Sequence, residues 1–183
     1  MADGKKSVEE IFEEAKKMIG KETTPVEEPY PIEYEPIRRY CLMVDDDNPL
    51  YHDPEYARKT RYGGVPYPPL ALFGIMGRGS PAMMASLTAG DSTEDAIMPP
   101  TPGKYLINMA QEWEWYKPVL IGDRLTMKMR IGDVYIKPIR IDPKAFWIVM
   151  EMHFSNQRGE MVALGRNIVL CHRSPDEVAA DNP

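Results

Sequence analysis

The stretch LTMKMRI, residues 125–131, alternates apolar and polar side chains without a break. Alternation with a period of two predicts a β-strand that has one buried face and one solvent-facing side. Residues 112–115 and 146–153 alternate in the same way, and residues 161–170 form a further strand candidate. Turn signals separate these runs at Gly122-Asp123, Gly132-Asp133, Asp142-Pro143 and Arg158-Gly159. The C-terminal half is therefore predicted to form several antiparallel strands.

An apolar helix is predicted before these strands. Residues 70–76, LALFGIM, are apolar almost all round, and a helix of this kind belongs inside a protein. One buried helix followed by antiparallel strands predicts an α+β fold. The 183 residues, 43% hydrophobic and 27% charged, suit one domain with its own core. Residues 77–104 are rich in Gly, Pro, Ser and Thr and are predicted to form a long loop.

The N-terminal segment begins with a helix signal. Ser7 and Glu10 form a capping box, apolar residues then repeat at helical spacing, and Gly20 ends the run. An amphipathic helix is therefore expected within residues 1–20. Residues 21–36 carry several prolines among acidic residues and are expected to form an extended connector.

Two further helices and a tail complete the predicted organisation. Pro36 is expected to open a helix that places Ile37, Tyr40, Cys41 and Val44 on one face. Pro54 is expected to open a short helix that runs to Arg61 and is broken by Gly63-Gly64. Residues 173–183 are polar and are expected to form a flexible tail.

Charge and cysteine content exclude several functions. The net charge of −6 and the pI near 5.2 argue against nucleic acid as a partner. The only two cysteines, Cys41 and Cys171, lie far apart without metal-type spacing, so no zinc site is expected. No apolar run has the length of a membrane span, and the first residues lack the apolar region of a signal peptide. These features predict a cytoplasmic protein without a membrane partner.

The run DDDNPLYHD, residues 45–53, is the candidate site for chemistry. It places three consecutive carboxylates close to one of only three histidines, a combination suited to proton transfer. Pro49 disfavours helix at Asn48, so the run is expected to bend between two ordered elements. Binding of a divalent cation is an alternative, but the run lacks the spacing of a known calcium loop.

Two other residue classes have both a structural and a functional interpretation. The thirteen methionines suit core filling, but Met76, Met83, Met84 and Met98 would also suit an adaptable apolar pocket. Several basic residues suit either solvated helix faces or contacts to phosphates of coenzyme A: Arg38, Arg39, Arg58, Lys59 and Arg61.

Four segments resemble one protein family. Residues 46–50 resemble the D-x-N-P-L-H-x-D loop of the MaoC-like (R)-specific enoyl-CoA hydratases and dehydratases. Residues 62–69 resemble the G-G-x-x-A-P-P segment of the family's N-terminal dehydratase branch. Residues 112–125 and 156–160 resemble its E-W-x-x-x-x-P-V-x-x-G-D-x-L and N-Q-x-G-E segments. The resemblance covers roughly residues 16–172, in the family's order and spacing.

This resemblance implies a fold and a partner. It implies a single hot-dog domain over residues 37–172, in which a curved antiparallel sheet wraps a central helix that includes residues 70–77. Such domains work in pairs, so a second hot-dog chain is expected, in a homo- or hetero-oligomer. The implied activity is the reversible hydration of a 2-enoyl-CoA thioester, without a metal or cofactor.

The resemblance also implies the site residues. Asp46 lies on the catalytic Asp position, Asn48 matches the family's Asn, and Tyr51 holds the position of the catalytic His. His52 follows, and Asp53 matches the trailing acid. In one alternative the loop shifts by one residue and His52 pairs with Asp47. In the other, which the fixed Asn, Pro and Asp positions favour, Tyr51 points into the site and His52 away from it.

The expected substrate-binding residues are Asn48, Gly63, Gly64 and Pro69. In relatives, a Gly N–H ahead of the central helix polarises the thioester carbonyl. This chain has Pro68-Pro69 there, and proline has no N–H to donate. Two hypotheses follow. The chain is a subunit of a hetero-oligomeric hydratase or dehydratase, or it is a non-catalytic acyl-CoA-binding or scaffolding subunit whose partner carries the Asp/His pair.

Overall fold

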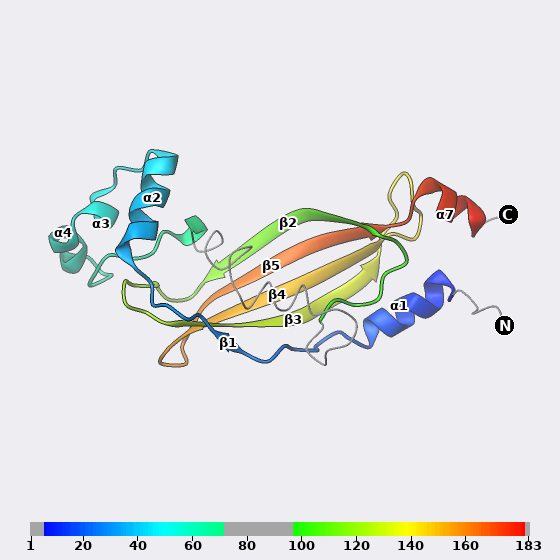
Figure 1. Ribbon diagram of the computed structural model, residues 1–183, viewed down its shortest axis with the longest axis horizontal. Coiled ribbons are helices and arrows are strands. Elements are labelled where there is room, and N and C mark those ends of the chain that lie inside the picture. Colours follow the sequence, from blue (N-terminus) through cyan, green and yellow to red (C-terminus); the bar gives the residue numbers. More distant parts are fainter. Residues whose placement is uncertain (1–5, 72–96, 182–183) are drawn as a thin grey trace.

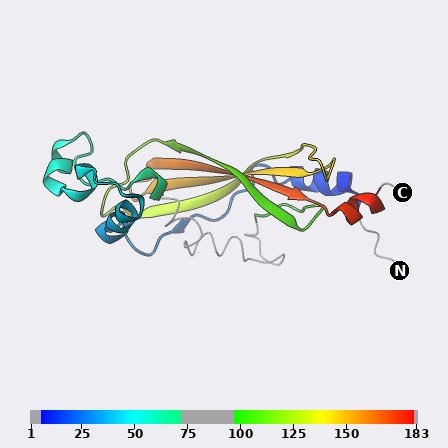
Figure 2. The same ribbon diagram turned by 90° about the horizontal axis from the view of Figure 1, so that it is seen from above.

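Four long antiparallel strands and one short strand form a single sheet (Figure 1). The computed structural model describes residues 6–71 and 97–181. The strands are β1 (Val26–Glu27), β2 (Tyr105–Trp115), β3 (Leu125–Ile136), β4 (Phe146–Asn156) and β5 (Met161–His172). Their order across the sheet is β1-β3-β4-β5-β2, and the sheet twists along its length (Figure 2). The predicted α+β class is confirmed.

The alternating sequence explains the core. Along β4 every second residue is buried, and the same holds for the first part of β3. Met129 on β3 lies opposite Met152 on β4, and both are almost fully buried. Phe12 of the N-terminal helix meets Phe146 edge to face, with the ring centroids 5.3 Å apart. The predicted periodicity of these strands, and the use of methionine as a core residue, are therefore confirmed.

The Gly132-Asp133 pair was predicted to be a turn, and this is wrong. The pair lies inside β3, where the register against β4 shifts between Ile131 and Asp133. A side chain at Gly132 would stand 3.0 Å from Cγ of Glu151, so glycine fits the close approach of the two strands. Glycine inside a strand often marks such a bulge.

The N-terminal segment is joined to the sheet edge. Helix α1 (Val8–Lys16) begins with the predicted capping box between Ser7 and Glu10. Downstream, the Thr23 N–H donates to the carbonyl of Met129 at 2.9 Å, and β1 pairs with β3. The predicted connector is thus an edge of the sheet, because its backbone N–H and C=O groups pair with β3.

Three helices form a lobe beyond one end of the sheet, whereas α1 and the C-terminal helix lie at the other end (Figure 1). The lobe contains α2 (Tyr34–Val44), α3 (Pro49–His52) and α4 (Pro54–Lys59).

Val44 does not share the buried face of Ile37 and Cys41 as predicted, because α2 ends there and Val44 is 46% exposed. No helix in the described ranges is long and apolar enough to span a membrane.

The predicted central helix lies largely outside the described residues. Within them, residues 69–71 are helical and Ala71 is buried. Met76, Met83 and Met84 also lie outside the described residues, as does most of the loop predicted over residues 77–104. Met98 is described, and it packs against the core in a partly buried position.

The C-terminal tail, expected to be flexible, instead forms helix α7 (Pro175–Ala180). Ser174 and Glu177 make a second capping box at its start. The Arg173 guanidinium, buried to 3% exposure, pairs at 2.7 Å with the carboxylate of Asp142, which is fully buried. Arg173 also pairs with Asp181. The Arg173–Asp142 ion pair joins the start of α7 to the connection between β3 and β4. The polar composition of the tail alone does not predict this contact.

We predict that Asp142→Ala lowers the free energy of unfolding by about 3 kcal/mol, because it leaves the buried Arg173 charge with only the partly exposed Asp181 as its partner. Glu35→Ala, which breaks an exposed pair with Arg38, is the control and should cost far less. Denaturant unfolding measures both. Equal losses would contradict a special role for the buried pair.

The same pair predicts a pH dependence. Burial acts to raise the pKa of Asp142, but hydrogen bonds from Arg173 and from the Lys144 backbone lower the pKa by more. The net pKa lies below its ordinary value, so the stabilisation is complete above pH of about 3.9 and is lost as the pH falls through the lowered pKa. The stability gap between wild type and Asp142→Ala should therefore narrow only in strong acid.

Candidate acyl-thioester site

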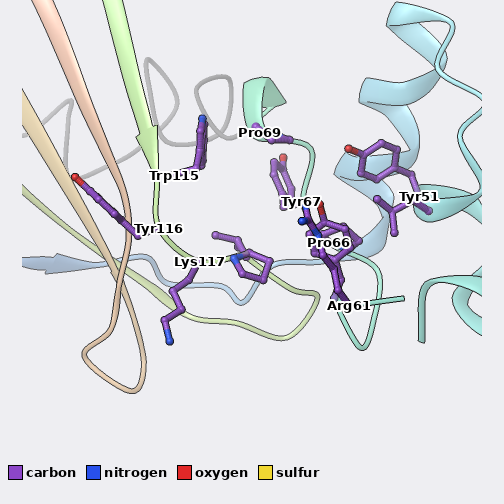
Figure 3. A pocket seen from close by; sticks show the side chains of 12 residues that line it. Tyr51, Arg61, Pro66, Tyr67, Pro69, Trp115, Tyr116 and Lys117 are labelled. Carbon is purple, nitrogen blue, oxygen red and sulfur yellow. Dashed lines mark hydrogen bonds between the residues drawn. The ribbon is translucent and has the colours of Figure 1, made fainter. Parts of the chain in front are cut away.

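A cavity of about 360 Å³ lies between the helical lobe and the end of β2 (Figure 3). Its walls come from α3, from the segment after α4, and from the end of β2 with the residues that follow. Most of the lining is aromatic or proline: Leu50, Tyr51, Arg61, Tyr62, Pro66, Tyr67, Pro69, Trp115, Tyr116, Lys117, Pro118 and Val119. Its volume lies in the range of small-molecule sites.

The acidic run is built as a chain of helix caps. Asp45 ends α2 in the left-handed conformation, with φ of 55°. The Asp46 carboxylate accepts the Asn48 N–H at 3.0 Å, and the Asn48 side chain accepts the Leu50 N–H at the start of α3. Asp53 caps α4 in the same way. The predicted bend between ordered elements is confirmed, and its polar side chains hold the loop's shape.

Tyr51 and His52 face different cavities. Tyr51 lines the 360 Å³ cavity, whereas His52 lines a separate cavity of about 520 Å³. His52 Nε2 lies 2.8 Å from the backbone carbonyl of Asp46. A carbonyl only accepts, so Nε2 carries the proton and donates it to this contact. In the described ranges the His52 ring makes no ion pair with a carboxylate, neither that of Asp46 nor that of Asp47.

The phenol of Tyr51 is held in its neutral form. Burial raises the pKa of Tyr51, and the negative charge of nearby Asp46 raises it further. The same two effects raise the pKa of the Cys41 thiol. At neutral pH Tyr51 is therefore a hydrogen-bond donor and a poor base.

The predicted substrate-binding residues are divided between the two cavities. Pro69 lines the cavity of Tyr51, whereas Gly63 and Gly64 line that of His52. Asn48 lines neither of these cavities and serves as the cap of α3. Asp46 also lines neither. The structure therefore does not bring the expected residues together around one cavity.

The stretch before the predicted central helix offers few N–H groups. Pro66, Pro68 and Pro69 have none, and the Tyr67 N–H already donates to the carbonyl of Val119 at 2.7 Å. As the sequence predicts, residues 66–69 therefore offer no free backbone N–H that could polarise a ligand carbonyl.

Sequence reasoning missed Tyr67 as a site residue. It is 5% exposed and lines the cavity between two prolines. Its signal was a tyrosine inside a proline-rich segment, where rigid backbone fixes the direction of the side chain. Trp115 stacks on Trp113, with centroids 5.3 Å apart, and also lines the cavity.

Most of the basic residues considered for contacts to coenzyme A form ion pairs or hydrogen bonds with neighbouring side chains. Arg38 and Arg39 pair with Glu35, and Arg58 pairs with Glu55. Arg61 lies at the cavity and donates to the Tyr62 hydroxyl at 2.9 Å. Over residues 6–71 and 97–181, no group of three or more His, Cys, Asp or Glu side chains is arranged to hold a metal ion.

Comparison with known proteins places the chain in a family. Residues 17–164 match the family described as "FAS1-like, dehydratase domain region". A UPF0336 protein of Streptomyces avermitilis is 30% identical over 110 residues, which cover 60% of this chain and 67% of that protein. A UPF0336 protein of Mycolicibacterium paratuberculosis is 25% identical over 135 residues, 73% of this chain and 74% of that protein.

Solved structures share the fold. The ChsH1-ChsH2 complex of Mycobacterium tuberculosis matches with a TM-score of 0.70 at 18% identity, covering 91% of this chain and 96% of that chain. The HadBC (3R-hydroxyacyl-ACP dehydratase) complex of the same organism gives 0.61 at 19% identity, covering 84% and 97%. A MaoC-like dehydratase of Rhodospirillum rubrum gives 0.58 at 20% identity, covering 86% and 94%. The chain therefore belongs to the FAS1-like dehydratase family and has the hot-dog fold of the MaoC-like dehydratases.

Proposed function

We propose that this chain is one subunit of a hetero-oligomeric hydratase or dehydratase that reversibly adds water to a 2-enoyl thioester. One observation supports the proposal: Tyr51, which by the sequence resemblance holds the family's His position, lines an aromatic cavity, while His52 lines another cavity. The chain would supply the acyl-binding cavity. A second hot-dog chain would supply the complete Asp/His pair.

The chemistry of hydration explains the need for the second chain. An acid/base residue must lie within hydrogen-bond reach of the water or the α-carbon proton. Tyr51 reaches the cavity but keeps its proton, because its pKa is raised. His52 is a suitable base, but its ring is bonded to the Asp46 backbone and lies in the other cavity. This supports a partner that performs the proton transfer.

Two apolar surfaces favour a protein partner. β2 is an edge strand of eleven residues, and Leu106 and Met109 on it are 52% and 47% exposed. A long exposed edge is a template for pairing with another chain. At the end of α2, Leu42 and Met43 are 66% and 74% exposed. The structural neighbours named ChsH1-ChsH2 and HadBC are complexes of two chains, which supports a hetero-oligomer here.

Two versions of this function differ in the role of Asp46 and His52. In the first, both take part in chemistry inside the assembly. In the second, the chain is a non-catalytic acyl-CoA-binding subunit and only the partner's pair is essential. The contacts of Asp46 and His52 within their own loop favour the second version.

We predict that the purified chain alone does not hydrate 2-enoyl-CoA thioesters. Activity should appear when it is co-expressed with a MaoC-like chain that has an intact Asp-x-Asn-Pro-x-His loop. The measurement is the loss of enoyl-thioester absorbance, over acyl chains of several lengths. Hydration by the chain alone, at the rate of the assembly, would refute the divided site.

Within the active assembly, we expect Asp46→Ala and His52→Ala to lower kcat by less than about tenfold. Removing the partner's Asp or His should cost at least about a hundredfold, the usual contribution of general acid/base catalysis. His153→Ala, on the outer face of β4, serves as a matched control. A hundredfold loss from His52→Ala at an unchanged melting temperature would return His52 to the chemistry.

A further inference from the structure

Two hydroxyl groups in the cavity have no hydrogen-bond partner among the described residues. Four tyrosines line it, and two of these are satisfied: the Tyr62 hydroxyl accepts from Arg61, and the Tyr116 hydroxyl donates to Glu114 at 2.8 Å. Over the described part of the chain, the hydroxyls of Tyr51 and Tyr67 bond to no other residue. In Figure 3 both hydroxyls lie on the cavity side, near Pro69.

The phenol of Tyr67 is enclosed by protein apart from its opening to the cavity. The side chain is 5% exposed, and burial alone raises its pKa. Among the described residues its hydroxyl oxygen is not one of the fully buried polar atoms without a partner, so it is accessible at the cavity. Such an oxygen suits a ligand contact, because ligand sites combine apolar walls with a few converging polar groups.

The surroundings select what kind of ligand group fits. Arg61 and Lys117 at the cavity are bonded to Tyr62 and Glu160. Tyrosine is protonated at neutral pH, and burial raises the pKa values of both phenols further. A neutral O–H suits an uncharged oxygen acceptor. The backbone of residues 66–69, with its prolines, has no free N–H to compete for it.

We propose that the hydroxyls of Tyr51 and Tyr67 donate hydrogen bonds to an uncharged oxygen of the bound acyl thioester. This inference rests on the proposed function and deepens it. The oxygen belongs either to the thioester carbonyl or to a keto group farther along the acyl chain. In the first case the phenols take the place of the N–H that Pro68-Pro69 cannot offer, as donors that polarise the carbonyl. In the second case they select oxygenated acyl groups.

Binding of saturated, unreactive ligands to the assembly tests this by calorimetry. The probes are decanoyl-CoA, its thioether analogue S-decyl-CoA without the carbonyl, and a decanoyl-CoA with a ketone in the chain. The variants are Tyr51→Phe and Tyr67→Phe. The control is Tyr135→Phe, whose ring stacks on Trp147 on the sheet, with centroids 6.3 Å apart. Tyr67→Phe should melt close to the wild-type temperature, because the hydroxyl that it removes makes no hydrogen bond to another described residue.

If the oxygen is the thioester carbonyl, each cavity variant loses about tenfold in affinity for decanoyl-CoA and nothing for S-decyl-CoA. If the oxygen is a keto group in the acyl chain of the ligand, the variants lose affinity only for the ketone-bearing ligand. Wild-type affinity of both variants for all three ligands would overturn the inference while leaving the proposed function intact. If the wild-type assembly binds none of the ligands, the proposed function itself fails.

Discussion

Consecutive side chains on a helix point about 100° apart, and this constraint separates Tyr51 from His52. Both lie on the single turn of α3, and they line different cavities. The helix caps at the two ends of α3 hold this turn in place, with Tyr51 at the 360 Å³ cavity. Asn48 closes the start of α3, and Asp53 ends it and starts α4. A shift of the loop by one residue would break both caps.

The same caps explain why an acidic cluster is a poor guide to chemistry here. A side-chain oxygen of each of Asp46, Asn48 and Asp53 accepts a hydrogen bond from a backbone N–H. These contacts hold the loop with Tyr51 at the cavity, and within the described residues the His52 ring makes no ion pair with a carboxylate. The acid/base function is proposed to lie in another chain.

Much of the fold could be predicted because alternation and capping are local. The alternation of residues along β3 and β4 indicates which face is buried, and the capping box of Ser7 and Glu10 indicates where α1 begins. Gly132 misled because glycine marks a turn and a bulge equally well in sequence, and only the approach of Glu151 distinguishes them. The helix in the C-terminal tail was not predicted, because the pairing of Arg173 with Asp142 joins residues far apart in sequence. Tyr67 was missed for a similar reason: its backbone bonds to Val119 and it lines the cavity together with Trp115, and a local pattern does not bring these residues near it.

We propose that the acyl thioester occupies the cavity of Tyr51 and not that of His52. A crystal structure of the assembly with an unreactive thioester analogue bound tests this placement. We expect the thioester to lie among Tyr51, Tyr67 and Trp115 of this chain, with the partner's Asp/His pair facing it. A ligand bound beside His52, Gly63 and Gly64 would refute this placement.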